Sequence, residues 1–268
     1  MATWWIELRR PEHDPARIKL EGDGPDAQKS MHEIDGLTVS VCVEEAHGRV
    51  DVAAEVTGLE EASCYLALCA AVPGATLQNF YGEMDAEEVV RQSPHDPDQH
   101  WINLAIHPVP LAGILEEDRS VFLVGDTPAH AENFTTQEFV PAKGRVALCT
   151  GDSGRQPGRD GLPVQAFFHP VGPGTSHRLD AIVVRPGTLD PAAVRLTLYE
   201  AITRRWGPAG AGRFTALCWG TNYMHLRRNE TGYSKVWIVP GIEYCNKQYT
   251  RDAFWQSMIL SPELDQQC

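Results

Sequence analysis

The side chains best suited to hold a sugar gather between Trp219 and Trp255, where aromatic, Arg, amide and carboxylate residues are dense. Aromatic rings cover the apolar face of a pyranose, and guanidinium and amide groups bind its hydroxyls. A pair of carboxylates supplies the acid and base of glycoside cleavage. On composition alone, a packed aromatic core with an Arg–Asp pair at a helix start is the favoured interpretation, because Asp is stabilised near a helix N-terminus.

Two other motifs could indicate a protease nucleophile and a metal site, and we reject both. Residues 151–154 read Gly-Asp-Ser-Gly, as around the nucleophile of chymotrypsin-like proteases, but no upstream histidine lies in the context such an enzyme needs. Gly, Asp and Ser all favour turns, so we interpret this tetrapeptide as a turn after a strand. His95, His100 and His107 lie close in sequence, yet the last two are an odd number of residues apart and would face opposite sides of a strand. We predict no metal site there.

Cysteine and glycine patterns give no support for a cofactor. The chain has 7 cysteines, an odd number, and several lie in apolar runs where a thiol behaves as a small hydrophobe. No pair has the spacing of a structural zinc site. There is neither a GxGxxG after a predicted strand nor a phosphate-binding GxxxxGK[ST], so we expect no cofactor.

The net charge of −13 disfavours some partners. An acidic surface repels phosphate backbones and anionic lipid heads, so neither nucleic acid nor a membrane is expected. No window approaches the about 20 apolar residues of a membrane helix, and the N-terminus does not read as a secretory leader. These features predict a cytoplasmic protein.

The elements that must position these side chains fall into three parts. Residues 1–187 are predicted to form an antiparallel β-sandwich, because short apolar runs from about Met31 onward alternate with Gly, Pro and Asp turns. Residues 82–92 are predicted as an inserted helix. Residues 188–212 form a linker helix starting after Asp190 and a Gly-rich hinge. Residues 213–268 are predicted to be the start of a helical domain and too few to complete it.

The run VPGIEYCNKQYTRDAFWQSMIL, residues 239–260, resembles the beginning of the catalytic domain in six-hairpin (α/α)6-barrel glycoside hydrolases. Such enzymes often carry an N-terminal β-sandwich or supersandwich joined to the barrel by a helical linker. The order of elements expected here is the same. The resemblance therefore implies a mainly β, supersandwich-like N-terminal domain followed by the start of a barrel.

The resemblance also implies roles for individual residues. Arg251 and Asp252 would line the sugar subsite, with Asp252 as the catalytic carboxylate. Trp255 and Tyr249 would form its walls, and Glu243 would be a polar contact. The sequence departs from the family because the residues after Gly212 can form only the first helices of such a barrel. We therefore expect little activity from the chain alone, since cleavage needs two carboxylates flanking the bond.

Three functions stay open at this stage. The first is the N-terminal portion of a carbohydrate-active enzyme, completed by a barrel and acting by glycoside hydrolysis. The second is a non-catalytic carbohydrate-binding sandwich, with Trp101, Trp206 and Trp219 as candidate platforms. The third is an interaction subunit, in which a partner chain or a second copy covers the C-terminal segment.

Overall fold

The structure is a computed structural model. It describes residues 2–20, 28–75, 80–81, 84–85, 106–107, 111–114, 119–126, 129–132, 134–135, 140–141, 144–150, 168–188, 190–210, 212–213, 215, 226–228 and 236–238.

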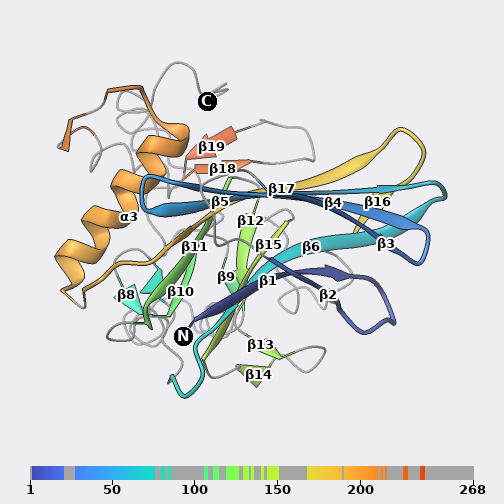
Figure 1. The fold of residues 1–268 in the computed structure, drawn as a ribbon, viewed down its shortest axis with the longest axis horizontal. Coiled ribbons are helices and arrows are strands. Elements are labelled where there is room, and N and C mark those ends of the chain that lie inside the picture. Colours follow the sequence, from blue (N-terminus) through green and yellow to red (C-terminus); the bar gives the residue numbers. More distant parts are fainter. Residues whose placement is uncertain are drawn as a thin grey trace.

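Two antiparallel sheets form a sandwich, as the sequence predicted (Figure 1). The seven-stranded sheet has the order β2-β1-β6-β15-β12-β9, with β16 also paired to β6. Its strands are β1 (Thr3–Arg9), β2 (Ala16–Lys19), β6 (Ala62–Ala71), β9 (Ile106–His107), β12 (Ala129–Glu132), β15 (Arg145–Thr150) and β16 (His169–Val171).

The six-stranded sheet has the order β10-β11-β17-β5-β4-β3. Its strands are β3 (Gln28–Ile34), β4 (Leu37–Ala46), β5 (Arg49–Gly58), β10 (Leu111–Ile114), β11 (Val121–Gly125) and β17 (Ser176–Val184). Three small two-stranded pairs join β7 (Phe80–Tyr81) to β8 (Met84–Asp85), β13 (Phe134–Thr135) to β14 (Val140–Pro141), and β18 (Leu226–Arg228) to β19 (Val236–Ile238).

The β4–β5 hairpin shows why these residues form strands. Val39, Val41 and Val43 are buried, and the residues between them are half-buried, which is the period of a strand with one face on the core. The connecting turn places His47 and Gly48 at positive φ, 52° and 78°. Two positive φ values in a two-residue loop match the right-handed twist of the flanking strands.

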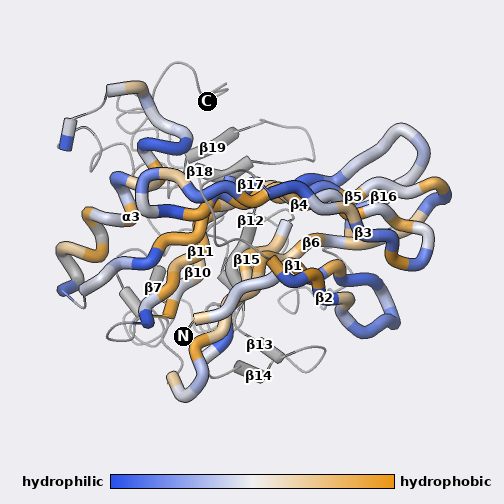
Figure 2. Tube along the Cα trace, in the orientation of Figure 1, coloured by the Kyte–Doolittle hydropathy of each residue, from blue (hydrophilic) through white to orange (hydrophobic). Residues whose placement is uncertain are grey.

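The core lies between the two sheets and is continuous. Ile6 and Leu8 of β1 and Leu66 and Leu68 of β6 are fully buried in it. Hydrophobic residues are dense along β10 and β11, where every described residue is buried (Figure 2). At β10 the packing is so close that a Cβ on Gly113 would come within 2.2 Å of the Phe122 ring.

The predicted linker helix is α3 (Pro191–Trp206), which lies at one end of the sandwich beside β5 (Figure 1). Its first bond runs from the Val194 N–H to the Asp190 carbonyl, 2.9 Å, with Pro191 at the first helical position where no N–H is needed. The helix ends where the Gly207 N–H donates to the Thr203 carbonyl at 2.8 Å. A side chain at 207 would clash with Thr203, so glycine suits this end.

The strand pattern is clear in the sequence from about Met31, and the structure adds β1 and β2 before it, with β1 inside the seven-stranded sheet. One prediction about the N-terminal half needs correction. Within the helix predicted for residues 82–92, Met84 and Asp85 form strand β8 instead, paired with β7. The other residues of that helix lie outside the described part, and the division at 187 and 212 stays a prediction.

The described residues contain no helix with the length and apolar character that a membrane span requires.

Candidate functional site

The residues predicted to bind sugar all lie outside the described part of the chain: Glu243, Tyr249, Arg251, Asp252 and Trp255. Trp101 and Trp219 lie outside it as well. Trp206, the third proposed platform, ends α3, and it packs against the core. The Arg205 guanidinium lies 5.7 Å from its ring centroid, so Trp206 is partly covered. The roles of the C-terminal residues therefore stay predictions.

The described residues hold one buried carboxylate cluster, on the face of the seven-stranded sheet opposite the main core. Glu7 of β1 is fully buried there. Its Oε2 lies 3.1 Å from Arg9 Nε, and its Oε1 lies 2.7 Å from Arg145 Nη2 and 3.3 Å from Arg17 Nε. Three guanidinium groups thus share one carboxylate. We call these residues, with Trp5 and Tyr65, the Glu7 cluster.

The aromatic members of the Glu7 cluster are held by the same groups. Trp5 Nε1 donates to Glu7 Oε1 at 2.8 Å, and the guanidinium carbons of Arg17 and Arg145 lie 5.0 and 5.5 Å from its ring centroid. Guanidinium groups at these distances are attracted by the ring quadrupole. Because both cations lie over Trp5, its ring is not an open platform for a pyranose.

The Glu7 carboxyl is held ionised. Burial raises its pKa, but the charges of Arg9 and Arg145 and hydrogen bonds from Trp5 and Arg9 outweigh burial, so the pKa is lowered. A general acid needs a raised pKa and access to the substrate. Glu7 has neither, and its chemistry is that of a structural anchor for the arginines around it.

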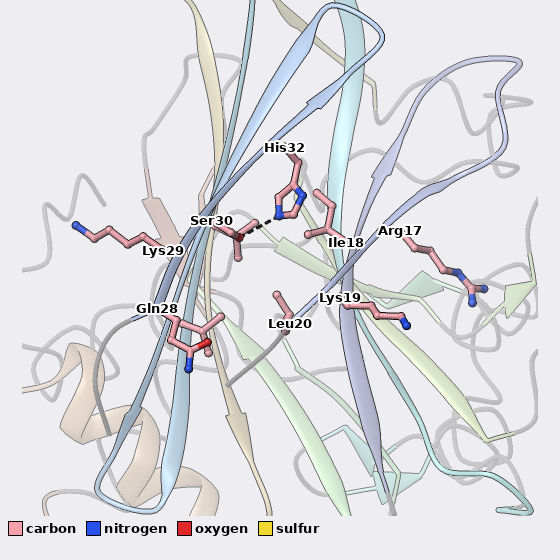
Figure 3. Close-up of a pocket in the computed structure, with 10 residues that line it drawn as sticks. Arg17, Ile18, Lys19, Leu20, Gln28, Lys29, Ser30 and His32 are labelled. Carbon is pink, nitrogen blue, oxygen red and sulfur yellow. Dashed lines mark hydrogen bonds between the residues drawn. The ribbon is translucent and has the colours of Figure 1, made fainter. Parts of the chain in front are cut away.

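A pocket of about 390 Å³ opens at the edge of the sandwich, between β2 of one sheet and β3 and β4 of the other (Figure 3). β2 and β3 are the edge strands of their sheets. Its lining residues are Arg17, Ile18, Lys19, Leu20, Gln28, Lys29, Ser30, His32, Val41 and Val43. We call it the edge pocket.

The walls of the edge pocket differ in character. Ile18 and Leu20 from the β2 side point into it in Figure 3, and Val41 of β4, which also lines it, is buried. On the β3 side the lining is polar, with Ser30 Oγ and His32 Nε2 3.0 Å apart. An apolar surface with a few convergent polar groups is the usual make-up of a small-molecule site.

A second pocket of about 390 Å³ lies where the chain leaves α3. It is lined by Glu200, Thr203, Arg204, Gly207, Pro208, Ala209, Gly210 and Arg213. It therefore borders the junction that leads toward the predicted sugar-binding segment.

A stacked histidine pair is the other buried titratable feature. The rings of His169 in β16 and His177 in β17 lie 4.4 Å apart at 18°. His177 Nε2 is buried with no hydrogen-bond partner in the described structure. Burial, with a smaller effect of His169, lowers the pKa of His177 to about 4. Within the described ranges, no three His, Cys, Asp or Glu side chains converge as metal ligands would.

Sequence reasoning missed both the Glu7 cluster and the edge pocket. In TWWIELR, apolar Ile6 and Leu8 alternate with Trp5, Glu7 and Arg9, which is the signal of a strand with one polar face. That signal predicts that Trp5, Glu7 and Arg9 share one face of a strand. It does not predict that Arg145 of β15 also contacts Glu7. The pocket depends on which strands end at the sheet edges, and the sequence pattern does not give that order.

Comparison with known proteins finds structural similarity but no family. No protein family and no curated protein matches the chain. A polysaccharide lyase is 13% identical, with a TM-score of 0.33, over 70% of this chain and 26% of its own. A protein described as a kojibiose phosphorylase from the human microbiome is 6% identical, with a TM-score of 0.36, over 82% of this chain and 27% of its own. The chain thus distantly resembles parts of two carbohydrate-active enzymes and spans about a quarter of their length.

Proposed function

We propose that the chain is the N-terminal portion of a carbohydrate-active enzyme, in which the sandwich is joined through α3 to a sugar-binding segment that takes part in glycoside hydrolysis. The observation that carries this proposal is the docking of α3 on the sandwich. The order of sandwich, docked helix and aromatic Arg-Asp segment is the order that the sequence resemblance implies.

The contacts of α3 hold the helix itself against the sandwich as far as its last turn. Val194, Leu198 and Ile202 are buried in the same core as the two sheets. Arg205 Nε lies 3.2 Å from Asp51 Oδ1 of β5, which fastens the last turn of the helix. A helix held by both apolar burial and an ion pair keeps its own C-terminal end beside the sandwich, where the described chain continues to Gly210.

The chemistry expected after α3 is that of a sugar subsite. Arg251 would bind hydroxyls in bidentate fashion and Trp255 would cover a pyranose face. Asp252 would be one of the two carboxylates that glycoside hydrolysis requires about 5 to 10 Å apart. A second carboxylate from the rest of the enzyme completes the pair, so the chain by itself is expected to bind saccharide and not to cleave it.

The proposal is tested by measuring saccharide binding to the full chain. A panel of neutral oligosaccharides is screened on an array, and hits are measured by calorimetry. Arg251→Ala and Trp255→Ala should each weaken binding at least about tenfold, since each removes a contact worth about 1.4 kcal/mol or more. Arg178→Ala, at an exposed position of β17, is the matched control and should change nothing. Binding that survives both C-terminal substitutions overturns the proposal.

The edge pocket favours a second function, a non-catalytic carbohydrate-binding sandwich. Its site would consist of β2, β3 and β4 and would not need the C-terminal segment. The same binding assay separates the two functions. Loss of neutral-saccharide binding on substitution of Ser30 and His32, with no effect of Arg251→Ala, favours the binding module.

A further inference from the structure

We propose that the open edge of β3 is the surface through which two copies of this chain pair, antiparallel and about a two-fold axis at Met31. This inference goes beyond the proposed function and does not depend on a saccharide. It also differs from the interaction subunit considered from the sequence, in which a second copy covers the C-terminal segment. The surface concerned belongs to residues 28–34.

The edge of β3 is long and open to solvent. Within the described part of the chain, β3 is the last strand of the six-stranded sheet and pairs only with β4. Each of its seven residues is exposed or half-buried. A strand with one unpaired side presents a row of N–H and C=O groups to which another strand can bond.

The β3–β4 hairpin fixes which residues bond β4. Asp35 and Gly36, at φ of 48° and 81°, form a two-residue loop between Ile34 and Leu37. The residues that flank such a loop form a hydrogen-bonded pair, and such pairs recur at every second residue. The even-numbered residues of β3 therefore bond β4. The loop at residues 47–48 agrees, because it leaves the odd-numbered residues of β4 for β3.

The odd-numbered residues of β3 direct their backbone groups to the open side. They are Lys29, Met31 and Glu33. Since hydrogen-bonded and non-hydrogen-bonded pairs alternate along an antiparallel ladder, the N–H and C=O groups of these three residues point away from β4. A second strand would bond to these residues.

The same three residues share the outer face of the sheet. Residues directly across an antiparallel pair point to one face, and Glu33 and Met31 lie across from Thr38 and Ser40. Thr38 Oγ1 donates to Glu33 Oε1 at 2.8 Å, which holds that carboxylate on this face. Lys29 points away from the edge pocket in Figure 3. The interface would thus use the face of β3 that the pocket does not.

The charges of β3 are complementary to themselves. Lys29 and Glu33 lie two residues on either side of Met31. In an antiparallel pairing centred on Met31, each Lys29 lies opposite Glu33 of the second copy. Opposite charges across a strand pair stabilise it, and like charges destabilise it. Within one strand the two residues are about 13 Å apart, too far to pair with each other.

The backbone favours this register as well. Position 29 would lie opposite 33, 31 opposite 31, and 33 opposite 29, so that outward-pointing groups meet and each pair exchanges two N–H···O=C bonds. A shift by one residue would set outward-pointing groups against groups already bonded to β4. A shift by two would keep the bonds but place Met31 opposite Lys29 or Glu33. Charge and backbone geometry therefore select one register.

A simpler explanation is that charged residues on an edge strand prevent pairing. That explanation accounts for Lys29 and Glu33 taken singly. It does not account for their symmetric spacing about Met31, which is 73% exposed. On the two-fold axis, Met31 would pack against Met31 of the second copy. Because the strand is its own complement, the occupant that fits it is a second copy of this chain.

The association of the full chain is measured by sedimentation equilibrium at about 0.15 M salt. We expect a dimer with a dissociation constant on the order of 100 µM, because an interface built mainly on one strand pair is small. Lys29→Glu and Glu33→Lys should each raise this constant at least about tenfold, since two-fold symmetry places like charges opposite each other twice. An equal mixture of the two variants should associate as the parent does, because each charge again meets its opposite.

The mixture also shows that both variants are folded, since unfolded chains would not restore association. Arg204→Glu makes the same charge change as Lys29→Glu on α3, which lies at the opposite end of the sandwich from β3 in Figure 1, and should change nothing. Net repulsion between acidic chains predicts that Glu33→Lys strengthens association, because it makes the chain less acidic. The proposal predicts the opposite.

Cross-linking tests the register. The Cα atoms of a hydrogen-bonded pair lie about 5.5 Å apart, within the range of a disulfide. Met31→Cys should therefore give a linked dimer under mild oxidation. Lys29→Cys should not, because its two thiols would be about 13 Å apart along the strands. The parent chain, with its own cysteines, is the control for unrelated linkage.

Three results overturn the inference. The first is a full chain that stays monomeric at about ten times the expected dissociation constant. The second is a dimer that both charge reversals leave unchanged. The third is a linked dimer from Lys29→Cys with none from Met31→Cys. None of them affects the proposed function, whose readout is saccharide binding lost in Arg251→Ala.

Discussion

The Glu7 cluster and the edge pocket lie on neighbouring strands and share Arg17, yet they use polar residues in opposite ways. In the cluster the carboxylate is fully buried, and four side chains contact its oxygens. In the edge pocket the polar groups of β3 border a space of about 390 Å³. Polar groups that satisfy one another stabilise a fold, whereas polar groups that face a hollow can bind something else.

The largest effect expected from this comparison is on stability, from Glu7→Gln. The neutral amide leaves Arg9 and Arg145, 11% and 19% exposed, without their counter-charge. Breaking a buried ion pair costs about 3 to 5 kcal/mol of unfolding free energy. Urea denaturation measures the change. Glu33→Gln, on an exposed stretch of β3, is the control and should stay within about 0.5 kcal/mol.

If Glu7→Gln lowered the unfolding free energy no more than Glu33→Gln does, the Glu7 cluster would not stabilise the fold. The cluster and the edge pocket would then not differ in the way described.

The next effect extends the comparison to His177, a buried side chain whose Nε2 has no hydrogen-bond partner within the described residues. The folded-state pKa of His177 is lowered to about 4 from a usual 6.5. The unfolded chain therefore takes up a proton that the folded chain refuses, so stability falls as the pH drops from about 6.5 toward 4. The loss is at most about 3 kcal/mol.

Urea denaturation at several pH values checks the His177 effect, and His177→Gln should flatten the curve in that window. The lowered pKa of Glu7 acts only further down, since its contribution is present above about 4.5 and is lost at lower pH. A parent protein whose stability is constant from pH 6.5 to 4.5 would contradict the assignment to His177.

A smaller effect is expected at the rim of the cluster. The Tyr65 hydroxyl accepts a hydrogen bond from Arg9 Nη1 at 3.0 Å, and its ring packs 5.1 Å from Phe168. Tyr65→Phe keeps the ring and removes the acceptor, so it should cost about 1 to 2 kcal/mol, because the donor is charged. Urea denaturation of Tyr65→Phe, of a variant at Arg9 and of the double variant separates this contact from the rest of the cluster. Additive effects would mean that the bond does not matter.

The smallest effect on stability is expected in the edge pocket. Ser30→Val places a better strand former at an exposed edge, so the unfolding free energy should change by no more than about 0.5 kcal/mol. A loss comparable to that of Glu7→Gln would mean that the pocket wall is structural after all. In that case the two regions would not differ as described.

The sequence predicts those parts of the molecule whose pattern is local. Strict alternation in β4 and β5 and the Asp190–Pro191 start of α3 are each complete within one segment, and the sandwich and helix are predictable from them. The short strand at Met84 is different, because acids and valines at near-helical spacing masked a pairing with β7.

The candidate sites depend on contacts that no local pattern contains. Glu7 and its partner Arg145 are 138 residues apart in sequence, and β6 lies between their strands. The edge pocket exists because β2 and β3 have no further neighbour strand in their sheets within the described part of the chain. Both facts are properties of strand order, and strand order depends on the packing of the whole sandwich.

The close approach of Gly113 to Phe122 limits how this protein can evolve. The two residues are paired across β10 and β11, and the ring occupies the space where any side chain at 113 would begin. A lineage can enlarge residue 113 only after residue 122 has become smaller. The two positions should therefore vary together among descendants of this sequence, with glycine retained wherever the phenylalanine is.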